Sequence, residues 1–356
     1  MPDSFAFIIT FAAALSGALF LTPIAIRLGH SYGIEAVPGG RRKHTGRVSK
    51  LGAIPIFGAF VFAVLIAQIL PVPRFDPKEV IRLIGLIGGG AVVFIVGLLD
   101  DKYELSAVQQ GIGQIAAAGV AVLFQIFIET VNNPFTGART EAWPYFLTIV
   151  FSMLWLGVTM NTVNFLDGID GLAAGVGFIA SAMLFVHSAF VLQPAQTSVS
   201  LLPLALCGCT LGYLLFNFYP ARIFLGGGAP LLGFLLGALS VIGGAKMATI
   251  LMVLGLPLMD FTWQVFRRIR QGRNPMSGDR GHLHFRLQDN GVDQRVIVLA
   301  YYLFCAFFGI LTLVITSAVF KVIAMGAMIL LLAGGFALVA RKNEGQTGSM
   351  SSSSSS

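Results

Sequence analysis

Charged side chains are scarce in this sequence: Asp, Glu, Lys and Arg make up 11% of its 356 residues, against 56% hydrophobic residues. Together with a mean hydropathy of +0.83, this balance excludes a soluble globular domain, in which about a quarter of the residues are charged. Uncharged stretches such as 4–26, 51–73, 296–320 and 322–340 reach the roughly 20 residues needed to cross a bilayer. The composition therefore predicts a polytopic membrane protein.

Cysteine is also rare, with three residues in the chain. Cys207, Cys209 and Cys305 all fall in apolar segments, so they do not form the spacing pattern of a disulfide framework or a zinc site. We expect them to be small packing residues. The sequence also lacks an internal repeat of fixed period.

The expected fold is all-α, with about eleven transmembrane helices. We predict them at about 4–27, 51–72, 80–99, 106–128, 143–160, 170–192, 199–217, 229–245, 247–266, 296–320 and 322–340. The chain start lacks the cationic residues of a signal peptide, so the first helix is expected to stay. Residues 1–342 are predicted to form one transmembrane domain, and 343–356 a disordered Ser-rich tail.

Lys and Arg are distributed unevenly between the two sets of connections. One set holds 17 of the 23: Arg27, Arg41, Arg42, Lys43, Arg47, Lys50, Lys102, Arg222, Arg267, Arg268, Arg270, Arg273, Arg280, Arg286, Arg295, Arg341 and Lys342. By the positive-inside rule this set is cytoplasmic, with the N-terminus outside and the C-terminus in the cytoplasm. The net charge of +7 then forms a layer facing anionic lipid headgroups, and a nucleic-acid partner is not needed to explain it.

Most polar sequence of chemical interest lies in the same cytoplasmic connections. The five segments are 38–44, 100–102, 161–170, 226–228 and 278–284. Because they share one face of the membrane, we expect them to converge on a single site.

The segment 161–170 places Asn161, Asn164, Asp167 and Asp170 at three-residue spacing. A charged side chain at the bilayer centre costs roughly 2.5–3.5 kcal/mol, so acids near a span indicate function. Amide and carboxylate oxygens suit Mg²⁺, which takes one or two carboxylates together with water and substrate phosphates. The alternative is a polar turn between helices in which Asp170 is the N-cap.

Asp100 and Asp101 follow an apolar helix, whose C-terminal end is already partly negative. Two carboxylates there need compensation by water or a cation, and a divalent cation would supply it. The alternative is that Asp101 caps the next helix with Glu104, or that Ser106 and Gln109 do so. Capping by Asp101 would leave Asp100 unexplained.

Two basic segments admit two interpretations. The run 41–44 is either a membrane-surface patch or a site for a lipid phosphate, and the same holds for the loop 267–295. His282 and His284 flank Leu283 in that loop. Without Cys or acidic partners at ligand spacing, zinc is not expected.

These motifs together resemble the polyprenyl-phosphate N-acetylhexosamine-1-phosphate transferases, which are glycosyltransferases of the family 4 type. The matching segments, in chain order, are Lys43-His44, Leu99-Asp100-Asp101 with Leu105-Ser106 and Gln114, Asn161-x-x-Asn164-Phe-x-Asp167-Gly-x-Asp170, Pro220-Ala-Arg-Ile-Phe224, Arg273-x-Pro275, and Asp279-Arg280-x-His282-Leu-His284. The last segment is more similar to the branch that transfers simple N-acetylhexosamines than to the muramyl-pentapeptide branch.

The resemblance implies transfer of a sugar-1-phosphate from a UDP-sugar to undecaprenyl phosphate in the bacterial inner (cytoplasmic) membrane. UMP is released, Mg²⁺ (or Mn²⁺) is the cofactor, and the product starts a cell-envelope glycan such as lipopolysaccharide or cell-wall polymer. The expected partners are the two substrates and the lipid bilayer. The sequence leaves open whether the protein forms a homodimer.

The same resemblance implies roles for individual residues. Asp100, Asp101, Asp167 and Asp170 would be catalytic and would hold the metal. The remaining site residues would bind the substrates: Lys43 and His44 the polyprenyl phosphate, and Asn161, Asn164, Arg280, His282 and His284 the donor side.

The chain departs from the family pattern at three positions. Gly227 stands where an aspartate is usual, Gln110 where a lysine is usual, and Phe285 where a third histidine is usual. A glycine side chain cannot bind a cation, so Asp167 or Asp170 takes over, or the affinity for metal falls, or catalysis is lost. An inactive homologue that binds polyprenyl phosphate or a protein partner is therefore an alternative, and a transporter is a more remote one.

Overall fold

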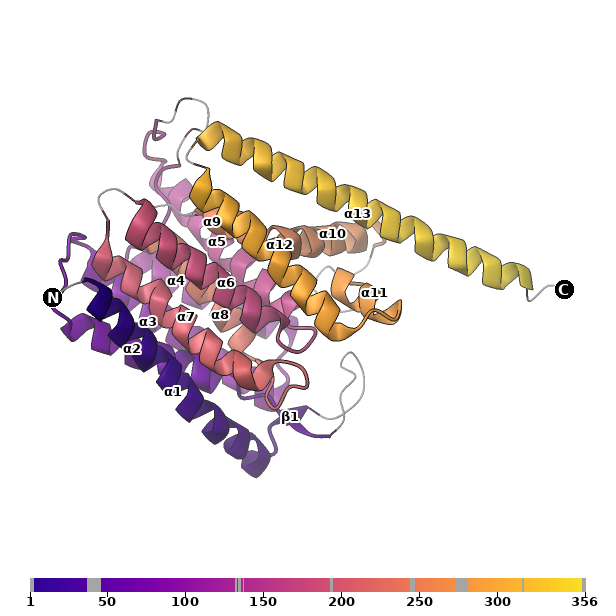
Figure 1. The fold of residues 1–356 in the computed structure, drawn as a ribbon, viewed down its shortest axis with the longest axis horizontal. Coiled ribbons are helices and arrows are strands. Elements are labelled where there is room, and N and C mark those ends of the chain that lie inside the picture. Colours follow the sequence, from indigo (N-terminus) through magenta and orange to yellow (C-terminus); the bar gives the residue numbers. More distant parts are fainter. Residues whose placement is uncertain are drawn as a thin grey trace.

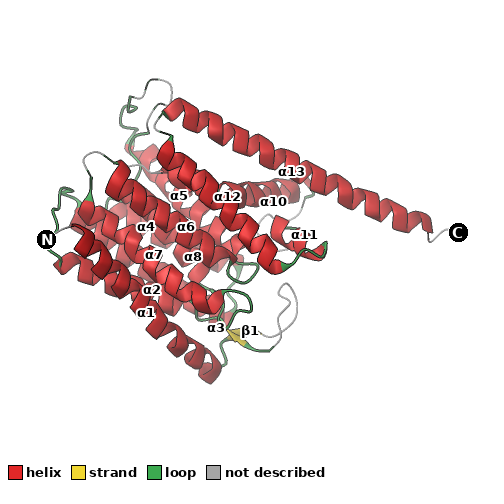
Figure 2. Cartoon of the chain, in the orientation of Figure 1, coloured by secondary structure: helices red, strands yellow, loops and turns green. Residues whose placement is uncertain are grey.

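The chain is helical almost throughout, as the computed structural model in Figure 2 shows. The structure describes residues 3–36, 46–131, 133, 136, 138–192, 195–243, 247–272, 281–315 and 317–353, with side chains to residue 335. The helices are α1 (Asp3–Tyr32), α2 (Ala53–Ile69), α3 (Glu79–Tyr103), α4 (Ala107–Leu123), α5 (Tyr145–Leu166), α6 (Leu172–Val186) continued by η1 (His187–Val191), α7 (Thr197–Asn217), α8 (Gly228–Ile242), α9 (Met247–Val253), α10 (Gly255–Arg270), α11 (Leu283–Asp289), α12 (Gln294–Val314) and α13 (Ala318–Ser353).

The helices form a bundle whose outer surface is apolar. Within the described residues, seven helices are long and apolar enough to cross a membrane, or eight if the bent pair α9–α10 is one span. Three shorter apolar helices, α2, α4 and α8, lie among them. Many large apolar side chains on the bundle surface are exposed, as expected where lipid is the solvent. The protein is therefore a polytopic membrane protein, as its composition predicts.

The centre of the bundle is formed by α7 and α8. Helix α7 packs against α1, α2 and α6, and α8 packs against α3 and α5. Small residues permit close approach: a Cβ on Gly208 would lie 2.8 Å from the Phe11 carbonyl oxygen of α1, the kind of contact that membrane helices use for association. In Figure 1 the helices run side by side and α13 extends beyond them toward the C-terminus.

One predicted helix is broken. The sequence suggests a single helix over 247–266, whereas α9 and α10 meet at Leu254 with a bend of 74°. Pro257 lies in the first turn of α10 and has no N–H to donate to the Val253 carbonyl. Because of this bend, α10 runs in a different direction from α9.

Helix α4 begins where it is predicted and ends at Leu123 instead of near 128, and α5 also differs from its expected end. Helix α4 begins after Ser106, which forms a capping box with Gln109, so the second capping alternative is confirmed and Asp101 is not this helix's N-cap. Helix α5 continues to Leu166 rather than ending near residue 160. Asn161 and Asn164 are therefore helical, and Asp167 follows as the C-cap.

A short β-pair anchors the loop between α1 and α2. Strand β1 (Glu35–Ala36) pairs antiparallel with β2 (Val48–Ser49), and Ser49 also bridges to Ile223. The Phe224 N–H donates to the Ser49 carbonyl at 2.8 Å, and the Gly52 N–H donates to the Phe224 carbonyl at 3.2 Å. These bonds hold the chain around Lys50 against the turn at 226–228.

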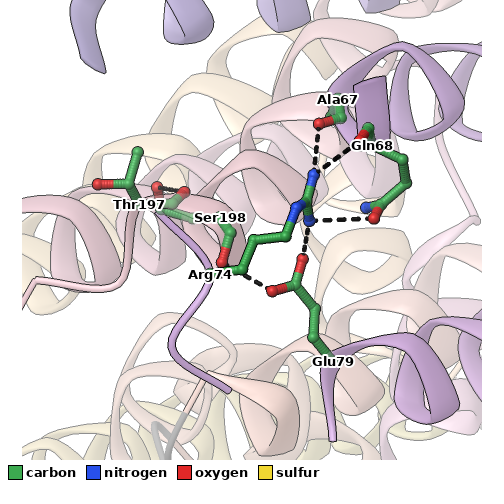
Figure 3. Close-up of polar contacts among 7 residues, drawn as sticks. Ala67, Gln68, Arg74, Glu79, Thr197 and Ser198 are labelled. Carbon is green, nitrogen blue, oxygen red and sulfur yellow. Dashed lines mark hydrogen bonds and ion pairs between the residues drawn. The ribbon is translucent and has the colours of Figure 1, made fainter. Parts of the chain in front are cut away.

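The opposite end of the bundle is tied by an ion pair between Arg74 and the buried Glu79 (Figure 3). The Arg74 guanidinium also donates to the carbonyls of Ala67 and Gln68, each at 3.0 Å. Ser198 donates to the second Glu79 oxygen at 2.9 Å. The end of α2 and the starts of α3 and α7 are thus joined away from the acidic motifs.

Two predictions about domain organisation stay open. Helix α13 runs to Ser353, and its side chains are described only to residue 335. The disordered tail 343–356 and the single domain 1–342 stay predictions.

Candidate functional site

A cleft of about 370 Å³, including its open mouth, lies where the C-terminal end of α3 meets α4, the end of α5 and the turn before α8. Its polar lining consists of Asp100, Gln110, Gln114 and Asn164. The apolar and glycine lining comes from Val93, Val96, Gly97, Gly113, Gly226, Gly227 and Pro230. Three of the five polar segments, 100–102, 161–170 and 226–228, therefore meet in one cleft.

Asp100 presents its carboxylate to this cleft. Gln110 Nε2 donates to Asp100 Oδ1 at 2.9 Å and to the Leu105 carbonyl at 3.1 Å, and the Leu105 N–H donates to the Asp100 side chain. The residue that replaces the usual lysine is thus in direct contact with the acid. Its neutral amide orients Asp100 without adding positive charge.

Asp101 points away from α4 and toward the start of α8. Its two oxygens accept from the Gly227 N–H at 3.0 and 3.1 Å, and the residue is 7% exposed. An anion at a helix N-terminus interacts favourably with the helix dipole. Asp101 therefore fixes the turn at 226–228 to α3.

The same turn does not offer its N–H groups to a phosphate. The Gly227 N–H bonds to Asp101, the Gly228 N–H to the Leu225 carbonyl at 2.8 Å and the Ala229 N–H to the Gly226 carbonyl at 3.0 Å. Protein acceptors therefore occupy the N–H groups of Gly227, Gly228 and Ala229.

Gly227 is packed directly against the backbone of α3. A Cβ at this position would lie 2.3 Å from Gly97 Cα and 2.4 Å from its carbonyl oxygen. No side chain, including the usual aspartate, fits without a shift of one backbone. Gly227, where the family resemblance implies an aspartate, therefore lies in a close contact between two glycines.

The segment 161–170 contributes Asn164 to the cleft and continues into the turn after α5. Asn161 Nδ2 donates to Gln114 Oε1 at 2.8 Å, which links α5 to α4 beside the cleft. Asp170 Oδ2 accepts from the Ala221 N–H at 3.0 Å and is not an N-cap, since that position belongs to Gly171. Asp167 lies near enough to Asp101 for their charges to interact.

Lys50 is a site residue that the sequence did not single out. Its ammonium interacts electrostatically with both Asp100 and Asp101 and lies 3.6 Å from Glu104 Oε1. In the sequence it is one cation among several in a basic loop, and only the contact between β2 and residues 223–224 brings it to the acids.

The histidine loop, residues 281–285, contacts the turn that follows Asp167. A Cβ on Gly168 would lie 2.2 Å from His284 Nε2, so this imidazole touches the turn after Asp167. His282 lies between His284, at 5.7 Å between ring centroids, and Phe165, at 5.2 Å. Phe285, which replaces the third histidine, is buried.

Asp260 is a second residue that sequence reasoning missed. It is 4% exposed, its Oδ2 lies 2.9 Å from His282 Nδ1, and its Oδ1 accepts from the Leu283 N–H at 3.0 Å. An acid within the apolar stretch 247–266 is the signal that could have found it, because such acids are rare and usually functional.

Three predicted substrate-binding residues lie outside the described residues. They are Lys43, His44 and Arg280. Their proposed roles rest on the sequence alone.

The donor chemistry of the cleft suits a magnesium ion. Among the described residues no three His, Cys, Asp or Glu side chains are grouped as a ready-made metal site. Magnesium, however, commonly uses one or two carboxylates with water and substrate phosphates. Asp100 and Asn164 line the cleft, and Asp167 lies near Asp101, so the carboxylates of Asp100 and Asp167 with the Asn164 amide oxygen are donors of the kind that fits.

Comparison with known proteins gives a consistent result. The profile of glycosyl transferase family 4 matches residues 83–244, which carry the acidic motifs, the segment 161–170 and the turn at 226–228.

Full-length relatives extend this match. A Bacillus subtilis protein named as a probable undecaprenyl-phosphate N-acetylglucosaminyl 1-phosphate transferase is 31% identical over 319 residues, covering 87% of this chain and 85% of the relative. A Mycolicibacterium smegmatis decaprenyl-phosphate N-acetylglucosaminephosphotransferase is 30% identical, covering 76% and 73%. An Escherichia coli K12 undecaprenyl-phosphate alpha-N-acetylglucosaminyl 1-phosphate transferase is 27% identical, covering 76% and 73%.

Proposed function

The chain belongs to glycosyl transferase family 4, and on that premise we propose that it transfers N-acetylglucosamine 1-phosphate from UDP-N-acetylglucosamine to undecaprenyl phosphate. The products are undecaprenyl diphospho-N-acetylglucosamine and UMP. The observation that carries the proposal is the meeting of Asp100, Gln114 and Asn164 in one cleft, with Asp167 near the neighbouring Asp101. The relatives' names supply the sugar and the polyprenyl class.

The reaction is an in-line displacement at the β-phosphorus of the donor. An oxygen of the acceptor phosphate forms the new P–O bond, and the bond to the bridging oxygen breaks, so that the electron pair leaves with UMP. Such transfers depend on positioning and charge stabilisation. Asp100 orients the acceptor phosphate or accepts its proton, and Lys50 balances the acidic cluster.

Magnesium, with manganese as a substitute, neutralises the donor diphosphate when bound. Asp100 and Asp167 would hold it together with Asn164. In this assignment Asp101 and Asp170 shape the site through their backbone contacts. His282 and His284 form the donor side, and Lys43, His44 and Arg280 keep the roles that the family resemblance implies.

The departures at Gly227 and Gln110 do not argue for an inactive protein. Gln110 keeps a hydrogen bond to Asp100, and the relatives that cover most of the chain are named as transferases. The comparisons give no support to the inactive alternative.

The proposed orientation follows from the separation of the two ends of the bundle. Asp3, at the start of α1, accepts from Thr197 at 3.0 Å, at the end opposite the cleft. If the basic connections are cytoplasmic, the cleft opens to the cytoplasm and the N-terminus lies outside. We assign eleven crossings by counting α2, α4, α8 and the α9–α10 pair with the seven long helices, in the bacterial inner membrane.

The deciding experiment measures UMP release from UDP-N-acetylglucosamine by purified protein, with undecaprenyl phosphate and Mg²⁺. We expect release to require both additions and to yield a lipid with the mass of the diphosphosugar. Replacing Asp100 by Asn should lower turnover by about 100-fold or more, since it removes a group acting on the reacting phosphate.

The matched control is Glu141→Gln, which makes the same chemical change at an exposed position at the other end of the bundle. It should leave turnover unchanged. Absence of UMP from the unmodified protein with either UDP-N-acetylglucosamine or UDP-N-acetylgalactosamine would contradict the proposal.

A further inference from the structure

Helix α10 carries a buried polar face toward the histidine loop. Asp260, Gln264 and Arg268 recur at four-residue intervals and are 4%, 1% and 1% exposed. Side chains at this spacing lie on one side of a helix. Burying polar side chains in an apolar bundle costs free energy unless they form hydrogen bonds. The partners of these residues therefore indicate the role of this polar face.

Those partners lie in the histidine loop and at the end of α5. Asp260 bonds to His282 Nδ1 and to the Leu283 N–H, and Gln264 donates to the Gly281 carbonyl. The Arg268 guanidinium carbon is 5.9 Å from the Phe165 ring centroid. Two side chains of α10, Asp260 and Gln264, thus bond to three consecutive residues, 281–283.

The contact with Asp260 also fixes the state of the imidazole. A carboxylate can only accept a hydrogen from His282, so the hydrogen is on Nδ1 and Nε2 faces away from Asp260. Phe165 and His284 hold the two faces of the ring. Nε2 is buried and has no hydrogen-bond partner among the described residues.

We propose that Asp260 is a positioning residue that holds the His282 imidazole with Nδ1 protonated, so that the Nε2 lone pair can accept a hydrogen bond from an N–H or O–H group of the donor's sugar. The inference rests on the proposed function for the identity of the donor. The contact itself does not depend on it. Asp260 touches no substrate and acts through His282, as carboxylates that orient catalytic or metal-binding histidines do.

The first test replaces Asp260 by Asn, which has the same shape. The Asn oxygen can still accept from Leu283, whereas its NH₂ group would face His282 Nδ1 and favour the reversed tautomer. We expect kcat to fall by about 10- to 100-fold and KM for UDP-N-acetylglucosamine to change less than about two-fold. Asp260→Glu should restore part of kcat.

The matched control is Asp289→Asn, because Asp289 is exposed at the end of α11. A double variant with His282→Gln should be no slower than His282→Gln alone if Asp260 acts through the imidazole. Additive losses, or an unchanged kcat in Asp260→Asn, would overturn the proposal.

A second measurement needs no activity. The chain has five histidines, so ¹⁵N-histidine NMR of the unmodified protein in micelles can identify His282 by comparison with His282→Gln. We expect a protonated Nδ1. An unprotonated Nδ1 overturns the inference even if the enzyme is active, and a protonated Nδ1 supports the contact even if the protein transfers another sugar.

Discussion

Gly227 meets two requirements that no other residue meets together. Its N–H donates to both oxygens of Asp101, and its Cα faces the backbone of Gly97 at a distance that excludes a Cβ. A side chain here would separate α3 from α8 and move Asp101. An aspartate introduced at 227 would consequently disturb packing as well as add a metal ligand.

We therefore predict that Gly227→Ala lowers the free energy of unfolding by about 1–3 kcal/mol, the usual cost of overpacking. The measurement is the thermal transition in detergent. Gly119→Ala is the control, since a Cβ there meets nothing within 4 Å and the change favours the helix by about 1 kcal/mol. An equal or higher transition temperature for Gly227→Ala would show that the α3–α8 contact is looser than described.

Among the elements, α4 and α10 prepare the site in different ways. Helix α4 begins at a capping box, and its first turns carry Gln110 and Gln114 into the cleft. Helix α10 is separated from α9 by its bend, and this lets its polar face reach the histidine loop. A residue at the start of each helix decides where that helix begins: Ser106 for α4 and Pro257 for α10.

For α4 we predict that Ser106→Ala costs about 1 kcal/mol, because the Gln109 N–H loses its acceptor. Thermal unfolding in detergent measures this. Ser16→Ala is the matched control, since Ser16 is exposed and bonds only to carbonyls of its own helix. It should change stability by less than about 0.5 kcal/mol. Equal effects of the two changes would exclude a role for the cap.

On the scale of the whole molecule, the two ends of the bundle differ in their polar contacts. One end is tied by the Arg74–Glu79 ion pair and by the Asp3–Thr197 hydrogen bond. The other end holds the acids, the glycine turn and the histidine loop. In the proposed function, this division places the chemistry on one side of the membrane, where a nucleotide sugar can reach it.

The orientation predicts the labelling of single cysteines by a membrane-impermeant maleimide. Glu141→Cys should react in intact spheroplasts, and Asp289→Cys only after permeabilisation. The native cysteines provide a silent background because all three are buried, and the unsubstituted protein controls for them. The reverse labelling pattern would show that the cleft faces outward.

The sequence by itself determined the class of protein, the approximate helices and the group of motifs from which the candidate site is proposed. It could do so because apolar length and charge bias act locally along the chain, as at α1 and α12. The tertiary structure decided which partner each polar side chain takes. Asp101 meets Gly227 across 126 residues of sequence, and Asp260 meets His282 only because α10 bends away from α9. Such pairings depend on helix packing and direction, which hydropathy and spacing do not specify.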